Sequence, residues 1–305
     1  MGKSSNSALV ILAFFAIYFI WGSTYLLNKI AVTELPPFML ASFRFTTAGI
    51  LIFIWAKLMK IPMKITKKQL INTIIAGFLF LSLGNGLAVW ALRYVDSGFA
   101  ALEISAQPLI ILLMMRILQG KKIQPMSVIG VVLGFVGIYL LVGQKQIITD
   151  GETVTGIIMI LGCMLSWGYA SLFVARADLP PNYFVNTGYQ MFFAGIFLIF
   201  MSLGFGEKWS SPWVWSGKVQ LALLLLVLFG SIVAFTSFNY LLKAVSPEKV
   251  ATSTYVNPIV ALILGWYFLD EQITLQSIVA AVILLTGVYF INTKKTLAIF
   301  ERFKR

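Results

Sequence analysis

Long apolar stretches with almost no charge recur along the whole chain, and this feature limits the possible folds most. About 20 helical residues cross a hydrocarbon core of roughly 30 Å. Transmembrane barrel strands are only about half as long and alternate in polarity. The sequence therefore predicts an all-α integral membrane protein with ten transmembrane helices, at Ala8–Leu27, Phe38–Ala56, Leu70–Leu92, Ser97–Met115, Ile123–Gln144, Thr153–Ala175, Leu179–Gly206, Val219–Leu242, Val250–Leu269 and Ile273–Thr293.

Composition excludes several kinds of chemistry. Hydrophobic residues make up 59% of the chain and charged residues 11%, against about 45–50% and about 25% in soluble proteins. There is no histidine, and Cys163 is the only cysteine. Imidazole catalysis, histidine metal sites and internal disulfides are thus excluded. We expect no cofactor, no metal and no enzymatic activity, because the spans contain only Arg44 and Glu103 as charged groups.

The net charge of +12 indicates orientation rather than nucleic-acid binding. With the N-terminus in the cytoplasm, 17 Lys and Arg residues lie inside and five lie outside. This bias predicts that both termini are cytoplasmic. The longest outer loop, around Glu207–Lys218, holds Trp209, Trp213 and Trp215, which we expect at the lipid headgroups.

The chain also repeats itself. A shift of 150 residues aligns Leu92–Val142 with Leu242–Asn292 without a gap, and ten of the 51 positions match, including co-registered Pro, Gly and Tyr pairs. We therefore divide the chain into a first repeat, residues 1–145, and a second, residues 146–305. Trp21-Gly22 and Trp167-Gly168 mark the start of each repeat at an offset of 146.

Five spans per repeat is an odd number, so the second repeat is inverted. The aligned loops agree, since Gly120-Lys121-Lys122 is basic where the topology places cytoplasm, and Asp270-Glu271-Gln272 is acidic where it places the exterior. Inverted repeats are the architecture of secondary transporters, in which two related halves alternately expose a midplane site. No phosphate-binding loop is present, so ATP is not the direct energy source.

The chain resembles the ten-helix, EamA-type exporters of the drug/metabolite transporter (DMT) superfamily. The specific motifs are Trp21-Gly22-Ser23, Arg44-Phe45 and the closing segment of each half, from Pro108 to Tyr139 and from Pro258 to Tyr289. The resemblance implies a multi-pass carrier of the bacterial inner (plasma) membrane that exports metabolites or toxic compounds through a central cavity. Lys121 and Glu103 depart from the family pattern.

Glu103 is the most informative single residue. It lies about six residues inside its span, roughly 9 Å deep, where a bare carboxylate is costly and is usually paired, protonated or functional. Arg44 lies at a similar depth in the second span. Two interpretations are open: a structural ion pair with Arg44, or a role in proton coupling or substrate binding. For Arg44 itself the alternatives are a structural role and contact with a substrate carboxylate.

Further polar residues share helix faces. Gln107 lies one turn from Glu103, and its repeat partner is Asn257. Such amides either line a cavity or hold helices together. Pro108 and Pro258 follow directly and predict kinks. Two stripes indicate cavity walls or simple packing: Trp21, Thr24, Tyr25 and Asn28 in the first span, and Thr236, Asn239, Tyr240 and Lys243 in the eighth, with Asn85, Trp90, Trp167 and Tyr255 as weaker candidates.

Together these features predict a secondary carrier that exports small metabolites, such as amino acids, or amphipathic toxic compounds by alternating access. Proton exchange is the expected driving force, with an uncoupled uniporter as the alternative and a channel or membrane enzyme as poorer fits. The expected partners are a small-molecule substrate, lipid and protons, without nucleic acid. Gly130, Gly134 and Gly137 allow close helix contact, within a monomer or between two copies.

Overall fold

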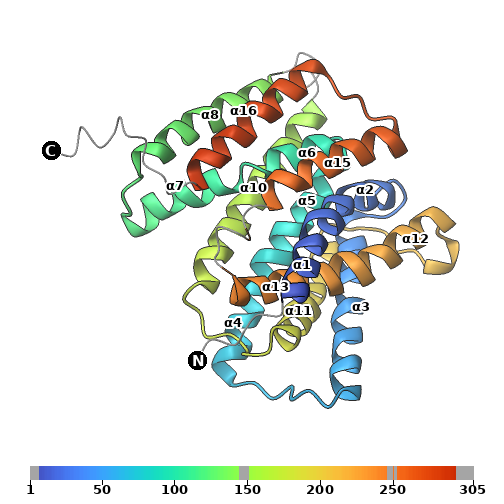
Figure 1. The fold of residues 1–305 in the computed structure, drawn as a ribbon. Coiled ribbons are helices and arrows are strands. Elements are labelled where there is room, and N and C mark those ends of the chain that lie inside the picture. The colour runs from blue at the N-terminus through green and yellow to red at the C-terminus, as the bar shows by residue number, and fades with distance from the viewer. Residues whose placement is uncertain (1–6, 144–150, 246–249, 251–252, 293–305) are drawn as a thin grey trace.

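The computed structural model describes residues 7–143, 151–245, 250 and 253–292. The described chain is helical, and its helices form ten spans (Figure 1). Eight helical stretches are long and apolar enough to cross a membrane, and the last two spans are shorter apolar helices. In chain order the spans are α1 (Ser7–Phe15) with η1 (Ala16–Ile20) and α2 (Trp21–Ala31); α3 (Pro37–Leu58); α4 (Lys67–Gly77) with η2 (Phe78–Asn85) and α5 (Gly86–Ala91); α6 (Ser97–Ile104) with α7 (Gln107–Gln119); α8 (Pro125–Val142); α10 (Gly151–Val174); α11 (Tyr183–Gly204); α12 (Gly217–Leu225) with η4 (Leu226–Val233) and α13 (Ala234–Ala244); α15 (Ser253–Leu269); and α16 (Leu275–Asn292).

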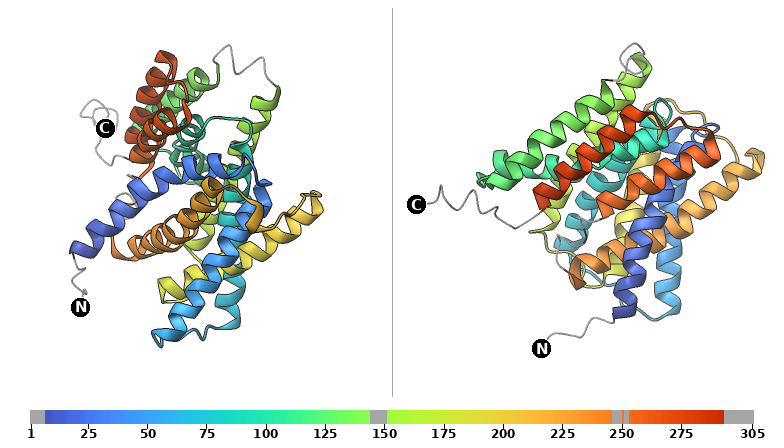
Figure 2. Two further views of the ribbon diagram at one scale, coloured as in Figure 1. Left: turned by 90° about the vertical axis from the view of Figure 1, so that its right-hand side faces the viewer. Right: turned by 45° about the horizontal axis from the view of Figure 1, so that its top comes forward.

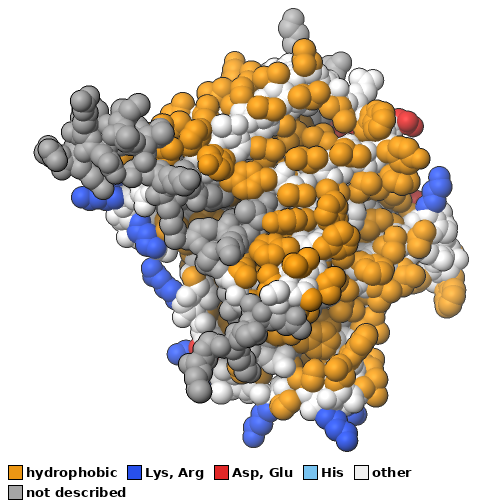
Figure 3. Space-filling model, viewed as in Figure 1, with side chains coloured by type: hydrophobic (Ala, Val, Ile, Leu, Met, Phe, Trp, Pro, Cys, Tyr) orange, Lys and Arg blue, Asp and Glu red, His pale blue; other side chains and the backbone are white. Residues whose placement is uncertain are grey.

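Apolar side chains cover the outside of the bundle. Figure 3 shows hydrophobic groups across the middle of one face, with Lys and Arg toward its edges. Exposed large residues such as Ile158, Phe200 and Val282 lie on these helices. In water such a surface would drive aggregation, whereas in a bilayer it is the surface that lipid requires. We use "outer" and "inner" below for the two ends of the bundle, as assigned by the loop charges.

Helices from corresponding positions in the two repeats pack against each other. The second span, α3, lies along the seventh, α11, and the fifth, α8, lies along the tenth, α16 (Figure 2). Glycines allow both contacts. A Cβ on Gly49 would meet the Phe192 backbone nitrogen at 2.7 Å, and a Cβ on Gly195 would clash with Thr46. These two contacts are related by the repeat, because Thr46 corresponds to Phe192 and Gly49 to Gly195 at an offset of 146 residues.

The α8–α16 contact answers the question left open by the small residues of the fifth span. A Cβ on Gly130 would lie 2.5 Å from the Gly287 carbonyl oxygen, and one on Gly137 would lie 2.9 Å from the Leu284 Cα. Gly134 faces the Leu109 side chain of α7. This small-residue face is therefore used for packing within one chain.

Three spans contain wide π-helical turns. η2 in the third span and η4 in the eighth begin at Phe78 and Leu226, 148 residues apart, and so lie at corresponding positions of the repeats. η1 lies in the first span, whereas the corresponding sixth span, α10, is a continuous α-helix. π-turns displace side chains and frequently mark functional sites.

The two prolines that directly follow Gln107 and Asn257 have different effects on their helices. The fourth span breaks after Ile104, and α7 restarts at Gln107 with Pro108 in its first turn. The ninth span, α15, passes through Pro258 as one described helix. The predicted kink is thus a full break in one repeat and is absorbed within a helix in the other.

The tryptophans of the outer loop do not all lie at the surface. Trp213 is 91% exposed, as expected for a headgroup-level ring. Trp215 is only 6% exposed, packs edge-on against Phe43 at 5.3 Å and donates a hydrogen bond to Ser210 Oγ. The expectation for Trp215 was wrong, because this ring is part of the protein core beneath the loop.

Candidate functional site

Two tryptophans related by the repeat meet at the centre of the bundle. Trp21 and Trp167 lie edge to face with ring centroids 6.2 Å apart. Phe238 of α13 packs on Trp21 at 5.1 Å, and Phe80 of η2 packs on Trp167 at 4.7 Å. Trp21 also donates its indole N–H to the Gly230 carbonyl at 3.3 Å. These aromatic side chains from four spans form an apolar wall bounded by the π-turns η2 and η4.

Arg44 lies beside this wall, fully surrounded by protein. Its side chain is 3% exposed, and its Nε donates to Ser231 Oγ of η4 at 2.8 Å. The guanidinium also stacks over the Phe45 ring at 4.8 Å. Among the residues that the structure describes, its Nη1 has no hydrogen-bond partner. A buried guanidinium with a free N–H is a strong candidate to bind a carboxylate.

Glu103 is buried in α6 and is also incompletely satisfied. The side chain is 3% exposed, and its Oε2 accepts no hydrogen bond from any described residue. Within the described residues, neither a hydrogen bond nor an ion pair joins Glu103 to Arg44. The ion-pair interpretation is therefore not realised in this conformation. Cys163 of α10 lies close enough to Glu103 for an electrostatic interaction.

The amide side chains of Gln107 and Asn257 hold neighbouring helices together. Gln107 donates to the Met164 carbonyl of α10 at 3.0 Å. Asn257, with its amide nitrogen facing the backbone of η1, donates to the carbonyls of Ile17 at 2.8 Å and Tyr18 at 2.9 Å. The bonds to Met164 and Tyr18 correspond across the repeats, because Gln107 and Asn257 are repeat partners and Tyr18 corresponds to Met164 at an offset of 146 residues. Interhelical bonding, the alternative to cavity lining, thus accounts for both amides.

Asn239 is likewise satisfied, since its amide donates to Thr187 Oγ1 of α11 at 2.8 Å. Asn28 and Asn85 differ, because each has a buried Oδ1 without a partner in the described part of the chain. Tyr25 lies one turn from Asn28 and is close enough to Cys163 for an electrostatic interaction. Asn28, Asn85 and Glu103 therefore share one property, a buried oxygen that lacks a donor.

Two weaker candidates lie outside this group. Trp90 packs against Phe38 and Phe205, each at 5.1 Å, near the outer end of α5. Tyr255 lines a shallow pocket between α15 and α16. Of the eighth-span stripe, Thr236 has a buried hydroxyl without a partner, and the side chain of Lys243 lies outside the described residues.

Sequence reasoning missed several contributors. Ser231 and Cys163 carry no signal of their own, because hydroxyl and thiol groups are common in membrane helices. Gln190, which corresponds to Arg44 at an offset of 146, is 2% exposed and has an unpartnered Oε1. Extending the repeat alignment into the second and seventh spans would have found it. Among the described residues, no cluster of three or more His, Cys, Asp or Glu side chains could hold a metal ion.

Comparisons with known proteins agree with this architecture. The model of the EamA-like transporter family matches residues 8–143 and again residues 154–293. The uncharacterized inner membrane transporter YedA of Escherichia coli K12 is 35% identical over 296 residues, covering 94% of each chain. The uncharacterized transporter YoaV of Bacillus subtilis is 24% identical over 93% of this chain and 96% of its own. One protein of known crystal structure covers 99% of this chain and 100% of its own, with a TM-score of 0.66 at 20% identity, and shares the fold.

Proposed function

Because this chain belongs to the EamA-like transporter family, we propose that it exports small amino-acid-like metabolites by alternating access, in exchange for protons at Glu103. It is an inner-membrane transporter and not an enzyme. The proposal concerns its substrate, direction and energy source. The observation that carries it is the buried, unpaired carboxylate of Glu103.

An unpaired acid in a membrane core has few stable roles. If ionised it needs a cation or donors, and among the described residues Oε2 has neither. A proton or the ammonium group of a substrate would supply what is missing. Exchange of one for the other at the same oxygen is the simplest way to couple proton entry to substrate exit.

Arg44 supports a substrate that also carries a carboxylate. Its free Nη1 is a donor without an acceptor, while Glu103 offers an acceptor without a donor. A zwitterion contains one complementary group for each, with the Trp21–Trp167 pair as an apolar surface for its side chain. A lipophilic cation would use Glu103 and the aromatic rings but leave Arg44 unused.

The test is efflux from cells preloaded with amino acids and with cationic dyes. We compare the native protein with Glu103→Gln, with and without a protonophore. The expected result is concentrative export of an amino acid by the native protein, at a rate that falls at least about tenfold in Glu103→Gln. The protonophore should abolish concentrative export by the native protein. Exchange of labelled for unlabelled substrate by the native protein, which needs no proton gradient, should persist. Asp178→Asn, at an exposed inner loop residue, is the matched control for loss of one carboxylate.

Each other outcome has a definite meaning. If Glu103→Gln still exports against a gradient, Glu103 is not the coupling group. If the native protein carries the solute only down its gradient, whatever the proton gradient, the chain is a uniporter. Export of dyes without amino acids, unchanged by Arg44→Gln, would contradict the zwitterion assignment.

A further inference from the structure

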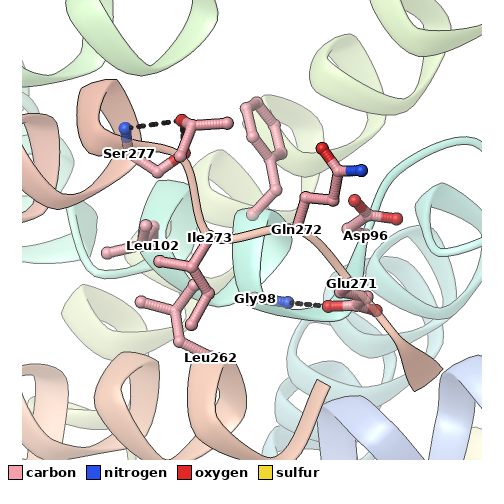
Figure 4. Close-up of a pocket in the computed structure, with 10 residues that line it drawn as sticks. Asp96, Gly98, Leu102, Leu262, Glu271, Gln272, Ile273 and Ser277 are labelled. Carbon is pink, nitrogen blue, oxygen red and sulfur yellow. Dashed lines mark hydrogen bonds between the residues drawn. The ribbon is translucent and has the colours of Figure 1, made fainter. Parts of the chain in front are cut away.

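A glutamate from the second repeat caps a helix of the first repeat at the outer end. Glu271 lies in the loop between α15 and α16 and reaches the N-terminus of α6 (Figure 4). Its Oε1 accepts from Ser97 N at 2.8 Å, and its Oε2 accepts from Ser97 Oγ at 2.9 Å and from Gly98 N at 3.1 Å. The local N-cap residue, Asp96, makes no side-chain cap. The carboxylate therefore satisfies free N–H groups that α6 cannot satisfy itself.

This contact lies where the fourth and ninth spans approach each other. A Cβ on Gly98 would lie 2.6 Å from the Leu262 side chain, and Gly265 faces Ser97 and Glu271. Only the outer half of the fourth span, α6, packs closely on α15, whereas the inner half, α7, packs on α10 and α16. Within the described residues, the close contact between spans four and nine thus lies at their outer ends.

The inner end carries a different set of residues. The repeat alignment places Lys121 at the position of Glu271, and it places Pro247 and Glu248 at the positions of Ser97 and Gly98. A lysine cannot accept from backbone N–H groups, and a proline has no N–H to donate. The sequence therefore does not repeat the carboxylate cap of the outer end at the inner end.

We infer that Glu271 is the latch of an outer gate between the fourth and ninth spans and holds that gate closed. This inference rests on the proposed alternating access. It assigns Glu271 a role in setting the conformational equilibrium, without contact to substrate.

The test measures the gate directly, by the distance between two spin labels on the full-length chain in lipid nanodiscs. Arg93→Cys and Gln272→Cys place the labels at exposed positions on the two sides of the gate, in a Cys163→Ala background. We expect one short distance with native Glu271. With Glu271→Gln, which loses the charge and one acceptor, we expect the population at longer distance to rise about tenfold.

Two controls separate gating from general damage. Glu207→Gln removes a comparable cap, since Glu207 accepts from Phe38 N at 3.0 Å and Met39 N at 2.8 Å at the start of α3. Because α3 and α11 are packed along their length, as Gly49 and Gly195 show, the label distance should not change. Asp270→Asn removes the neighbouring charge without removing the latch, and it should also leave the distance unchanged.

A second variant keeps the inference testable if Glu271→Gln folds poorly. Ser97→Ala removes the hydroxyl that donates to Glu271 Oε2 at 2.9 Å, and it should also increase the long-distance population, to a smaller extent. An unchanged distance in a folded Glu271→Gln, or an equal response in Glu207→Gln or Asp270→Asn, overturns the latch. If Glu271→Gln does not fold, an unchanged distance in Ser97→Ala overturns it. A gate that responds in a chain without concentrative export would overturn the proton-coupled function alone.

Discussion

At the scale of single residues, the membrane core and the outer surface use carboxylates differently. Glu103 is buried, and its Oε2 lacks a donor among the described residues. Glu207 and Glu271 each accept at least three hydrogen bonds, shared between their two carboxylate oxygens. A satisfied carboxylate stabilises one conformation. An unsatisfied one is free to change partners, which is what a coupling residue requires.

Asp96 gives a prediction for pH dependence, since it lies in the outer loop beside the latch. Burial, and then the negative charge of Glu271, raise the pKa of the Asp96 carboxyl, while Lys29 opposes the shift. Because the folded protein holds the Asp96 proton more tightly than the unfolded chain does, the protonated carboxyl stabilises the fold. This stabilisation is complete below the ordinary carboxyl pKa of about 4 and is lost as the pH rises through the raised value.

We therefore expect Asp96→Asn to raise the melting temperature in detergent at pH 7 and to leave it unchanged near pH 4. Thermal unfolding of both proteins across this range measures the difference. Equal melting temperatures at every pH would contradict the assigned shift. Asp270→Asn, which removes an acid from the same outer surface, is the control.

At the scale of helices, close backbone approach holds the repeats together. Membrane helices gain little from the hydrophobic effect between them, so interfaces depend on tight packing and on hydrogen bonds. Gly130 and Gly287 provide this contact between α8 and α16, where each faces the other's carbonyl oxygen. The amide bonds of Gln107 and Asn257 to backbone carbonyls are the polar counterpart.

Gly130→Ala should destabilise the protein by about 1–3 kcal/mol, because the added methyl group would meet the rigid Gly287 backbone. Gly204→Ala is the matched control, since a Cβ there has no neighbour within 4 Å and alanine favours a helix. Thermal stability of the two variants in detergent measures the difference. A Gly130→Ala protein as stable as Gly204→Ala would show that α8 and α16 can separate without cost.

At the scale of the whole molecule, the loop charges predict the orientation, and the two repeats determine how the helices are arranged. The 17-to-five excess of basic residues on one side predicts cytoplasmic termini. The repeat then places corresponding helices in opposite directions across one membrane. A charge that differs between corresponding loops, as at Lys121 and Glu271, therefore makes the two faces of the carrier inequivalent.

Reporter fusions test this orientation. A fluorescent protein that folds only in the cytoplasm should be active when fused after Arg305, and alkaline phosphatase should be active when fused after Gly143, where the outer loop begins. The reverse pattern would contradict the assigned orientation and would place the Glu271 latch at the cytoplasmic face. A fusion after Gly120, in an inner loop, is the internal control for both reporters.

The sequence by itself determined the ten spans, the inverted repeat and the family, and the family match over both halves confirms that resemblance. These follow from local composition and from residues compared at one offset, which need no knowledge of contacts. Arg44 and Glu103 were also evident, because any charge within an apolar span is unusual.

Only the tertiary structure decided which polar residues are already satisfied. Gln107, Asn239 and Asn257 bind neighbouring helices, while Asn28, Asn85, Arg44 and Glu103 keep free atoms. Glu271 caps a helix that begins 174 residues earlier in the chain. Hydrogen bonds depend on distance and direction to within a few tenths of an ångström. Helix periodicity fixes the face on which a side chain lies, but not the group that it meets there.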